Sequence, residues 1–141
     1  MPLGRSSLAV VLGFCVLSFC SACKHHGEGA ENTVDDHLSV SGGNCVQTVG
    51  GNAVNYVPVG PNQTVTWTAP NATTSCSIHF DNNAGACPFY SASANQCDYS
   101  CTNGTVTSKP AAGNSGTQYP YGSWQVGGTN CQVGQDGLVM R

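Results

Sequence analysis

Charged side chains are scarce in this sequence. Asp, Glu, Lys and Arg together make up 8% of its 141 residues, against about a quarter in a typical soluble protein. From residue 38 onward only five remain: Lys109, Arg141, Asp81, Asp98 and Asp136. No basic patch can therefore follow a phosphate backbone, which argues against nucleic-acid binding. Gly, Asn, Ser and Thr make the expected surface polar without making it ionic.

The sequence also lacks an apolar run long enough to cross a bilayer. The run at residues 8–19 spans about 12 residues, whereas a membrane helix needs about 20. Arg5 precedes it, and the small residues Ser21 and Ala22 follow it, which is the pattern of an export signal. We therefore expect residues 1–22 to direct export and then to be removed.

The end of this signal resembles the lipobox of bacterial lipoproteins. Ser21, Ala22 and Cys23 match that motif, while Cys20 stands where Leu is usual. The resemblance implies that Cys23 is diacylated and becomes a lipid-anchored N-terminus. In a diderm host, Lys24 at the next position resembles an outer-membrane lipoprotein, facing the periplasm or the exterior. Two alternatives stay open, a frame ending at Cys20 and ordinary cleavage that releases a soluble, secreted protein.

Residues 23–37 contain almost nothing apolar and are predicted to be a flexible tether. Three of the four histidines of the chain lie here, His25, His26 and His37. Weak capture of a divalent transition metal is an alternative for this segment. The composition is explained equally well by a solvated spacer, so we predict no metal site.

The clearest pattern lies between residues 61 and 80. Val65, Trp67 and Ala69 alternate with threonines, and Cys76, Ile78 and Phe80 resume the alternation after the turn signal Pro70-Asn71. A period of two places alternate side chains on opposite faces of a strand. The sequence therefore predicts two half-buried strands. We expect Trp67 on the first strand, and Cys76, Ile78 and Phe80 on the second, to face the core of the domain.

Further short strands are expected around this pair, and no window shows the spacing of an amphipathic helix. The expected strands are residues 45–49, 53–59, 97–101, 104–108, 117–126 with a bulge near Gly122, and 138–140. Short strands with turns every 8–12 residues are typical of an antiparallel Greek-key sandwich. We predict one all-β domain over residues 38–141.

The segment from Gly60 through Val65 and Trp67 to His79 resembles the early half of cupredoxin-like domains. In those domains a strand with alternating Val and Trp precedes a strand that bears the first copper histidine. The resemblance implies a cupredoxin-like sandwich, with an immunoglobulin-like sandwich as the alternative. It also implies a copper site, but no histidine follows His79, and Cys101 leads into Thr-Asn-Gly-Thr rather than into a His and a Met. We therefore predict no copper and no cofactor.

Six cysteines fall in the predicted domain, an even number that favours up to three disulfides in an exported protein. Their connectivity, one of 15, is left open, and free buried thiols are the alternative. The candidates are Cys45, Cys76, Cys87, Cys97, Cys101 and Cys131. A zinc site would need a second close pair beside Cys97 and Cys101, and none is present.

No residue set specifies a reaction, so we predict a protein that is not an enzyme. His79 with a thiol or with Asp81 is the nearest approach to a catalytic pair, but paired thiols are expected in an oxidising compartment. Tyr119, Tyr121 and Trp124 could present a stacking surface for a glycan or a partner protein, although such residues more often fill a core. The sequence predicts an envelope lipoprotein with a binding or structural role; the alternative is a periplasmic metal-binding or redox protein related to cupredoxins.

Overall fold

The structure is a computed structural model that describes residues 32–141, and within them the chain forms twelve strands and no helix. The prediction of an all-β sandwich is confirmed. The strands are β1 Thr33–Ser41, β2 Asn44–Val49, β3 Asn52–Val54, β4 Tyr56–Val59, β5 Thr64–Thr68, β6 Cys76–His79, β7 Asp98–Ser100, β8 Thr105–Thr107, β9 Gln118–Pro120, β10 Ser123–Val126, β11 Thr129–Asn130 and β12 Gly137–Met140.

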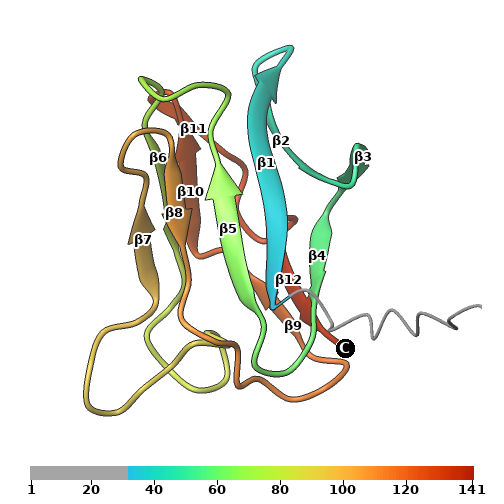
Figure 1. Cartoon of the computed structure of the whole chain (residues 1–141), viewed down its shortest axis with the longest axis vertical. Helices are drawn as coiled ribbons and strands as arrows, with labels where there is room; N and C mark the ends of the chain where they lie inside the picture. The colour runs from blue at the N-terminus through green and yellow to red at the C-terminus, as the bar shows by residue number, and fades with distance from the viewer. Residues whose placement is uncertain (1–31) are drawn as a thin grey trace, which may run out of the picture.

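Three sheets surround one core. A five-stranded sheet has the order β3-β2-β1-β5-β8, a four-stranded sheet the order β11-β10-β6-β7, and a three-stranded sheet the order β4-β12-β9. In Figure 1 strands β1 and β5 lie in front of β10 and β6, while β4, β12 and β9 lie in the lower part of the view. The apolar faces of these sheets meet in the interior.

The alternation around Trp67 is confirmed by burial. Trp67 is fully buried, and the side chains of the two predicted inward sets are at most 4% exposed: Val65, Ala69, Cys76, Ile78 and Phe80. Aromatic rings then pack around Trp67, with Phe89 edge-on at 6.2 Å and Tyr99 tilted at 5.0 Å between ring centroids. Such pairs contribute roughly 0.5–1.5 kcal/mol each beyond the area they bury.

The boundary between tether and domain was predicted wrongly, because β1 begins at Thr33, inside residues 23–37. Its inward positions are Val34, Asp36 and Leu38, and the carboxylate at the middle position conceals the strand pattern. The strand pairs antiparallel with β2 and parallel with β5, so it is interior to its sheet. The rest of the predicted tether and the signal lie outside the described residues.

Two of the three sheets are mixed rather than purely antiparallel, which corrects the finer expectation. Strand β1 runs parallel to β5, and β4 runs parallel to β12. Alternation within a strand does not report the direction of its neighbour, so this feature is invisible in the pattern.

Two segments expected as single strands each divide between two sheets. Residues 53–59 form the end of β3 and then β4, and residues 117–126 form β9 and β10. The irregular spacing near Gly122, which predicted a bulge, marks the point where the chain changes sheet. Tyr119, Tyr121 and Trp124 are at most 2% exposed, so they fill the core and present no stacking surface.

All six cysteines of the domain are paired, as Cys45–Cys131, Cys76–Cys101 and Cys87–Cys97. Their Cα–Cα distances of 5.3, 5.0 and 6.0 Å lie within the usual range for disulfides. The prediction of three disulfides is confirmed, and free thiols are excluded for these residues. Cys23, the predicted lipidation site, lies outside the described residues.

Candidate functional site: a polar pocket beside a buried acid

A polar cluster lies inside the core, where β1 and β2 meet the segment between β9 and β10. Trp67 Nε1 donates to the hydroxyl of Tyr121 at 2.9 Å, and this hydroxyl lies 3.0 Å from Gln47 Oε1 and 3.5 Å from Asp36 Oδ2. Asp36 and Gln47 are both fully buried. A buried polar group is tolerated when it is hydrogen-bonded, and here each member is held by another.

Asp36 is the exception within this cluster, since its Oδ1 atom has no hydrogen-bond partner among the described residues. Burial raises the pKa of this carboxyl from 3.8 to about 7, although hydrogen bonds from the Thr48 backbone and the Tyr121 hydroxyl oppose the rise. The negative charge of Asp136 adds to it. Asp36 is thus mostly neutral in mildly acidic solution, and a neutral carboxyl can donate a hydrogen bond to Tyr121.

Gln47 connects this cluster to a surface pocket. Its Nε2 atom donates to the backbone carbonyl of Asn55 and lies 3.4 Å from that of Gly137. Gly137 N in turn donates to Asn55 O at 2.9 Å. The buried amide of Gln47 therefore links the backbone at Asn55 to the backbone at Gly137, the residue after Asp136.

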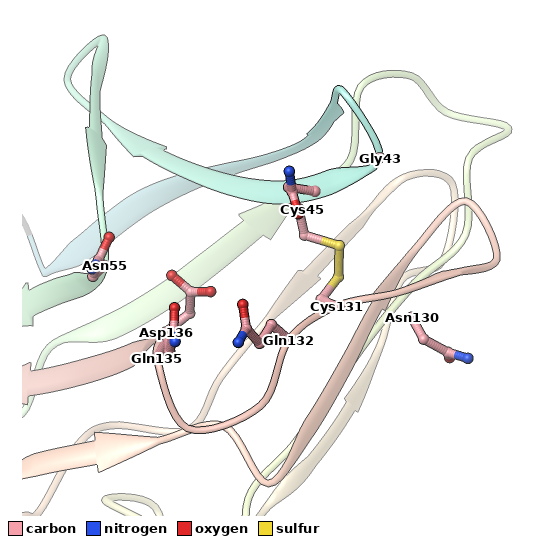
Figure 2. A pocket seen from close by; sticks show the side chains of 9 residues that line it. Gly43, Cys45, Asn55, Asn130, Cys131, Gln132, Gln135 and Asp136 are labelled. Carbon is pink, nitrogen blue, oxygen red and sulfur yellow. A yellow bond between two sulfur atoms is a disulfide. The ribbon is translucent and has the colours of Figure 1, made fainter.

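The pocket itself has a volume of about 420 Å³ and opens between the start of β2, residue Asn55 and the loop from Cys131 to Asp136. Figure 2 shows the Cys45–Cys131 disulfide joining β2 to this loop across the pocket. Its polar side chains are Asn44, Asn55, Asn130, Gln132, Gln135 and Asp136. A volume of this size is in the range of small-molecule sites.

The polar side chains of the pocket differ in where they extend and in whether they already form hydrogen bonds. In Figure 2 Gln132 extends from the loop toward Asp136, whereas Asn130 extends away from it. Asn130 Oδ1 also accepts a hydrogen bond from Gln125 at 2.5 Å. Partial burial raises the pKa of Asp136 from its ordinary value. No side-chain hydrogen bond joins Asn55, Gln132 or Gln135 to any residue of the segment 32–141, and all three are exposed, so their amide groups face solvent in the pocket.

His79 forms a separate polar group on the surface of the four-stranded sheet. Its Nδ1 contacts Asp98 Oδ1, and Asn95 donates to the other oxygen of that carboxylate. These two hydrogen bonds lower the pKa of Asp98. Ser123 is the register neighbour of His79 on β10, so Ser, His and Asp form a row across three strands.

This row lacks what acyl transfer requires. None of its residues lines the pocket between Asn55 and Asp136 or either of two smaller cavities elsewhere in the domain. No hydrogen bond within residues 32–141 joins Ser123 to His79, and a nucleophile needs a base within reach. We interpret the His79–Asp98 contact as a surface ion pair, of small effect on stability.

The described residues contain no group of three His, Cys, Asp or Glu side chains arranged to hold a metal ion. Those same residues also include no helix long and apolar enough to cross a membrane. His25 and His26 of the predicted tether lie outside them. His37 lies on β1 with its side chain exposed.

The fold thus defines an all-β, disulfide-linked domain with a polar pocket. Comparison with known protein families finds no matching family model, and comparison with curated proteins finds no significant match.

Sequence reasoning did not find this site. Its amides come from β2, from the link between β3 and β4, and from the loop before β12, which are far apart in the chain. Among its residues the sequence predicts a role only for Cys45 and Cys131, as disulfide candidates with their pairing left open, and Asp136 stands out only as one of five charges. Asn and Gln in turn-rich segments are ordinary loop residues, so no local signal distinguishes those that converge.

Proposed function

We propose that the protein is an envelope-anchored lipoprotein whose domain is a non-catalytic binding module. Export and acylation at Cys23 would attach it to a membrane, and the pocket between Asn55 and Asp136 would bind the ligand. The observation that carries the binding role is this pocket, where the Asn55, Gln132 and Gln135 amides have no side-chain hydrogen bond to residues 32–141 and a disulfide joins two of the walls.

The three disulfides support an oxidising compartment, as export through residues 1–22 would provide. The lipid anchor rests on the lipobox resemblance alone. Intact-mass measurement of the membrane fraction tests it, because diacylation adds the mass of the lipid at Cys23 and three disulfides remove six hydrogens. A soluble protein that begins at Cys23 without added lipid would overturn the anchor.

The binding role is tested by amide NMR of the isotope-labelled full chain in detergent, titrated with the low-mass fraction of a bacterial envelope digest. We expect shifts confined to residues around the pocket. Gln132→Trp, which fills the pocket from its exposed rim, should abolish them. Gln118→Trp, at an exposed position of β9 outside the pocket, should leave them unchanged. Shifts that persist in Gln132→Trp, or no shifts at all, would contradict the proposal.

The second candidate is a metal-binding or redox protein related to cupredoxins. It is favoured by one observation: the strand that carries Val65 and Trp67 is followed by β6, which carries His79. Against it, Nδ1 of His79 contacts Asp98, and every cysteine of residues 32–141 is in a disulfide. Titration of the full chain with Cu²⁺ and Zn²⁺ decides between the candidates. Stoichiometric binding lost in His79→Ala would favour the second.

A further inference from the structure

We infer that the ligand of the pocket between Asn55 and Asp136 is a small neutral saccharide, a conclusion that rests on the proposed binding function. Four properties of the pocket carry it: its charge, its hydrogen-bonding groups, the absence of rings from its lining, and its rigidity.

The charge of the pocket argues against anionic ligands. Asp136 is its only charged side chain, and neither Lys109 nor Arg141 lines it. A phosphate or carboxylate ligand would lie beside this partly buried carboxylate with no cation to offset the repulsion. A ligand whose groups donate hydrogen bonds to Asp136 avoids that cost.

The hydrogen-bonding groups match hydroxyls. Each amide of Asn55, Gln132 and Gln135 offers two donors and an acceptor, while the Asp136 carboxylate only accepts. A sugar hydroxyl both donates and accepts. Adjacent hydroxyls can therefore accept hydrogen bonds from the amides and donate hydrogen bonds to the Asp136 carboxylate. Hydrogen bonds to a charged acceptor are the stronger kind, which makes Asp136 the expected centre of recognition.

The pocket contains no aromatic side chain, and beyond its six polar side chains the lining is Gly43 and the Cys45–Cys131 disulfide. Flat aromatic ligands and acyl chains require apolar or aromatic walls, which most small-molecule sites provide. The aromatic residues suggested by the sequence for sugar stacking, Tyr119, Tyr121 and Trp124, are in the core. Recognition here would therefore depend on hydrogen bonds and not on ring stacking.

The walls of the pocket are held in place before a ligand arrives. The disulfide fixes the loop at Cys131, the parallel pairing of β4 with β12 fixes its other end, and Gln47 bridges the carbonyls of Asn55 and Gly137. A fixed backbone loses little conformational entropy on binding, so the cost is limited to ordering the exposed amide side chains. This compensates for the weak net gain of neutral hydrogen bonds in water.

Calorimetric titration of the full chain in detergent, with its disulfides intact, tests the inference. The probes are maltose, cellobiose and N,N′-diacetylchitobiose, with glucose 6-phosphate and spermidine as charged comparisons. We expect at least one neutral saccharide to bind, with an affinity about ten- to a hundredfold lower in Asp136→Ala and reduced in Gln132→Ala. Gln118→Ala, a matched glutamine on β9, should bind as the unchanged protein does, and circular dichroism verifies that each variant is folded.

The outcomes separate this inference from the proposed function. If the envelope digest shifts the pocket amides but none of the saccharides binds at 10 mM, roughly the weakest affinity worth testing, the ligand class is wrong and the binding module stands. Tighter binding of spermidine or of glucose 6-phosphate would also overturn the saccharide. If the digest shifts nothing either, both proposals fail.

Discussion

Asp36 occupies an inward position of β1, between Val34 and Leu38, where a sandwich strand usually carries an apolar side chain. A lone carboxylate in such a place is unfavourable because it loses its hydration. The protein accommodates it through a hydrogen bond with Tyr121, which itself contacts Gln47, and by keeping it neutral over a wide pH range. The free-energy cost of burying the Asp36 carboxyl should therefore depend on pH.

We predict that the free energy of unfolding decreases as the pH rises from about 4 to about 7. The folded protein retains the Asp36 proton up to a pKa of about 7, whereas the unfolded chain releases it near 3.8. Folding thus becomes less favourable across this window by roughly 4 kcal/mol, and the loss levels off above it. Urea unfolding at a series of pH values measures the change.

Asp36→Asn provides the control, because an amide of the same shape does not titrate. The groups that face Asp36, namely Tyr121 and Asp136, remain in the variant. The difference between the two profiles therefore isolates Asp36, and parallel profiles for the two proteins would contradict the prediction.

At the scale of single elements, β12 depends on a glycine at its first residue. A Cβ atom at Gly137 would lie 2.2 Å from the Tyr119 carbonyl oxygen and 2.7 Å from Pro120 Cα, both backbone atoms of the neighbouring β9. The backbones of these two strands can approach closely only because no side chain stands between them. The same residue follows Asp136 of the pocket, and its N–H donates to the backbone carbonyl of Asn55.

Gly137→Ala should therefore destabilise the protein by at least about 1–3 kcal/mol, the usual cost of forcing extra atoms into a packed interior. Thermal and urea unfolding measure the loss. Gly85→Ala is a matched control, since its Cβ would meet only Asn83 Oδ1 at an ordinary 3.4 Å, and its stability should change by no more than about 0.5 kcal/mol. Equal effects of the two substitutions would show that the close approach of β9 and β12 is unimportant.

For the whole molecule, the three disulfides constrain very different lengths of chain. Cys45–Cys131 joins residues 86 apart and links β2 to the segment after β11, whereas Cys87–Cys97 closes a loop of 10 residues within one connection. A longer closed loop removes more freedom from the unfolded chain. The first bridge should therefore matter more for stability.

Replacing Cys45 and Cys131 together by Ser should lower the free energy of unfolding by about 4–5 kcal/mol, and replacing Cys87 and Cys97 by about 3 kcal/mol. Urea unfolding without reductant provides both numbers. The order of the two losses is the critical result: a larger loss for the shorter loop would indicate that strain or packing, rather than chain entropy, determines the contribution.

The sequence predicted those parts of the fold that have a local cause. Alternation identified the inward faces of β5 and β6, and the count of six cysteines predicted three bridges. The alternation pattern did not reveal β1, because Asp36 interrupts its apolar positions. It also predicted β9 and β10 as one strand, because a change of sheet disturbs the spacing of apolar residues in the same way as a bulge. The pocket could not be predicted from the sequence. Its lining comes from loops that are far apart in the chain, and the periodicity of side chains does not report which loops converge.

Strand β1 has one more consequence if the chain is anchored at Cys23. Cys23 and Thr33 are only ten positions apart in the sequence, so the domain would stand within about 35 Å of the lipid surface. A pull between that surface and a ligand held beyond the Ser41 end would run along β1, which is bonded on both edges to β2 and β5. Such a load would shear two hydrogen-bonded ladders at once rather than peel one, so we expect a domain tethered in this way to resist tension.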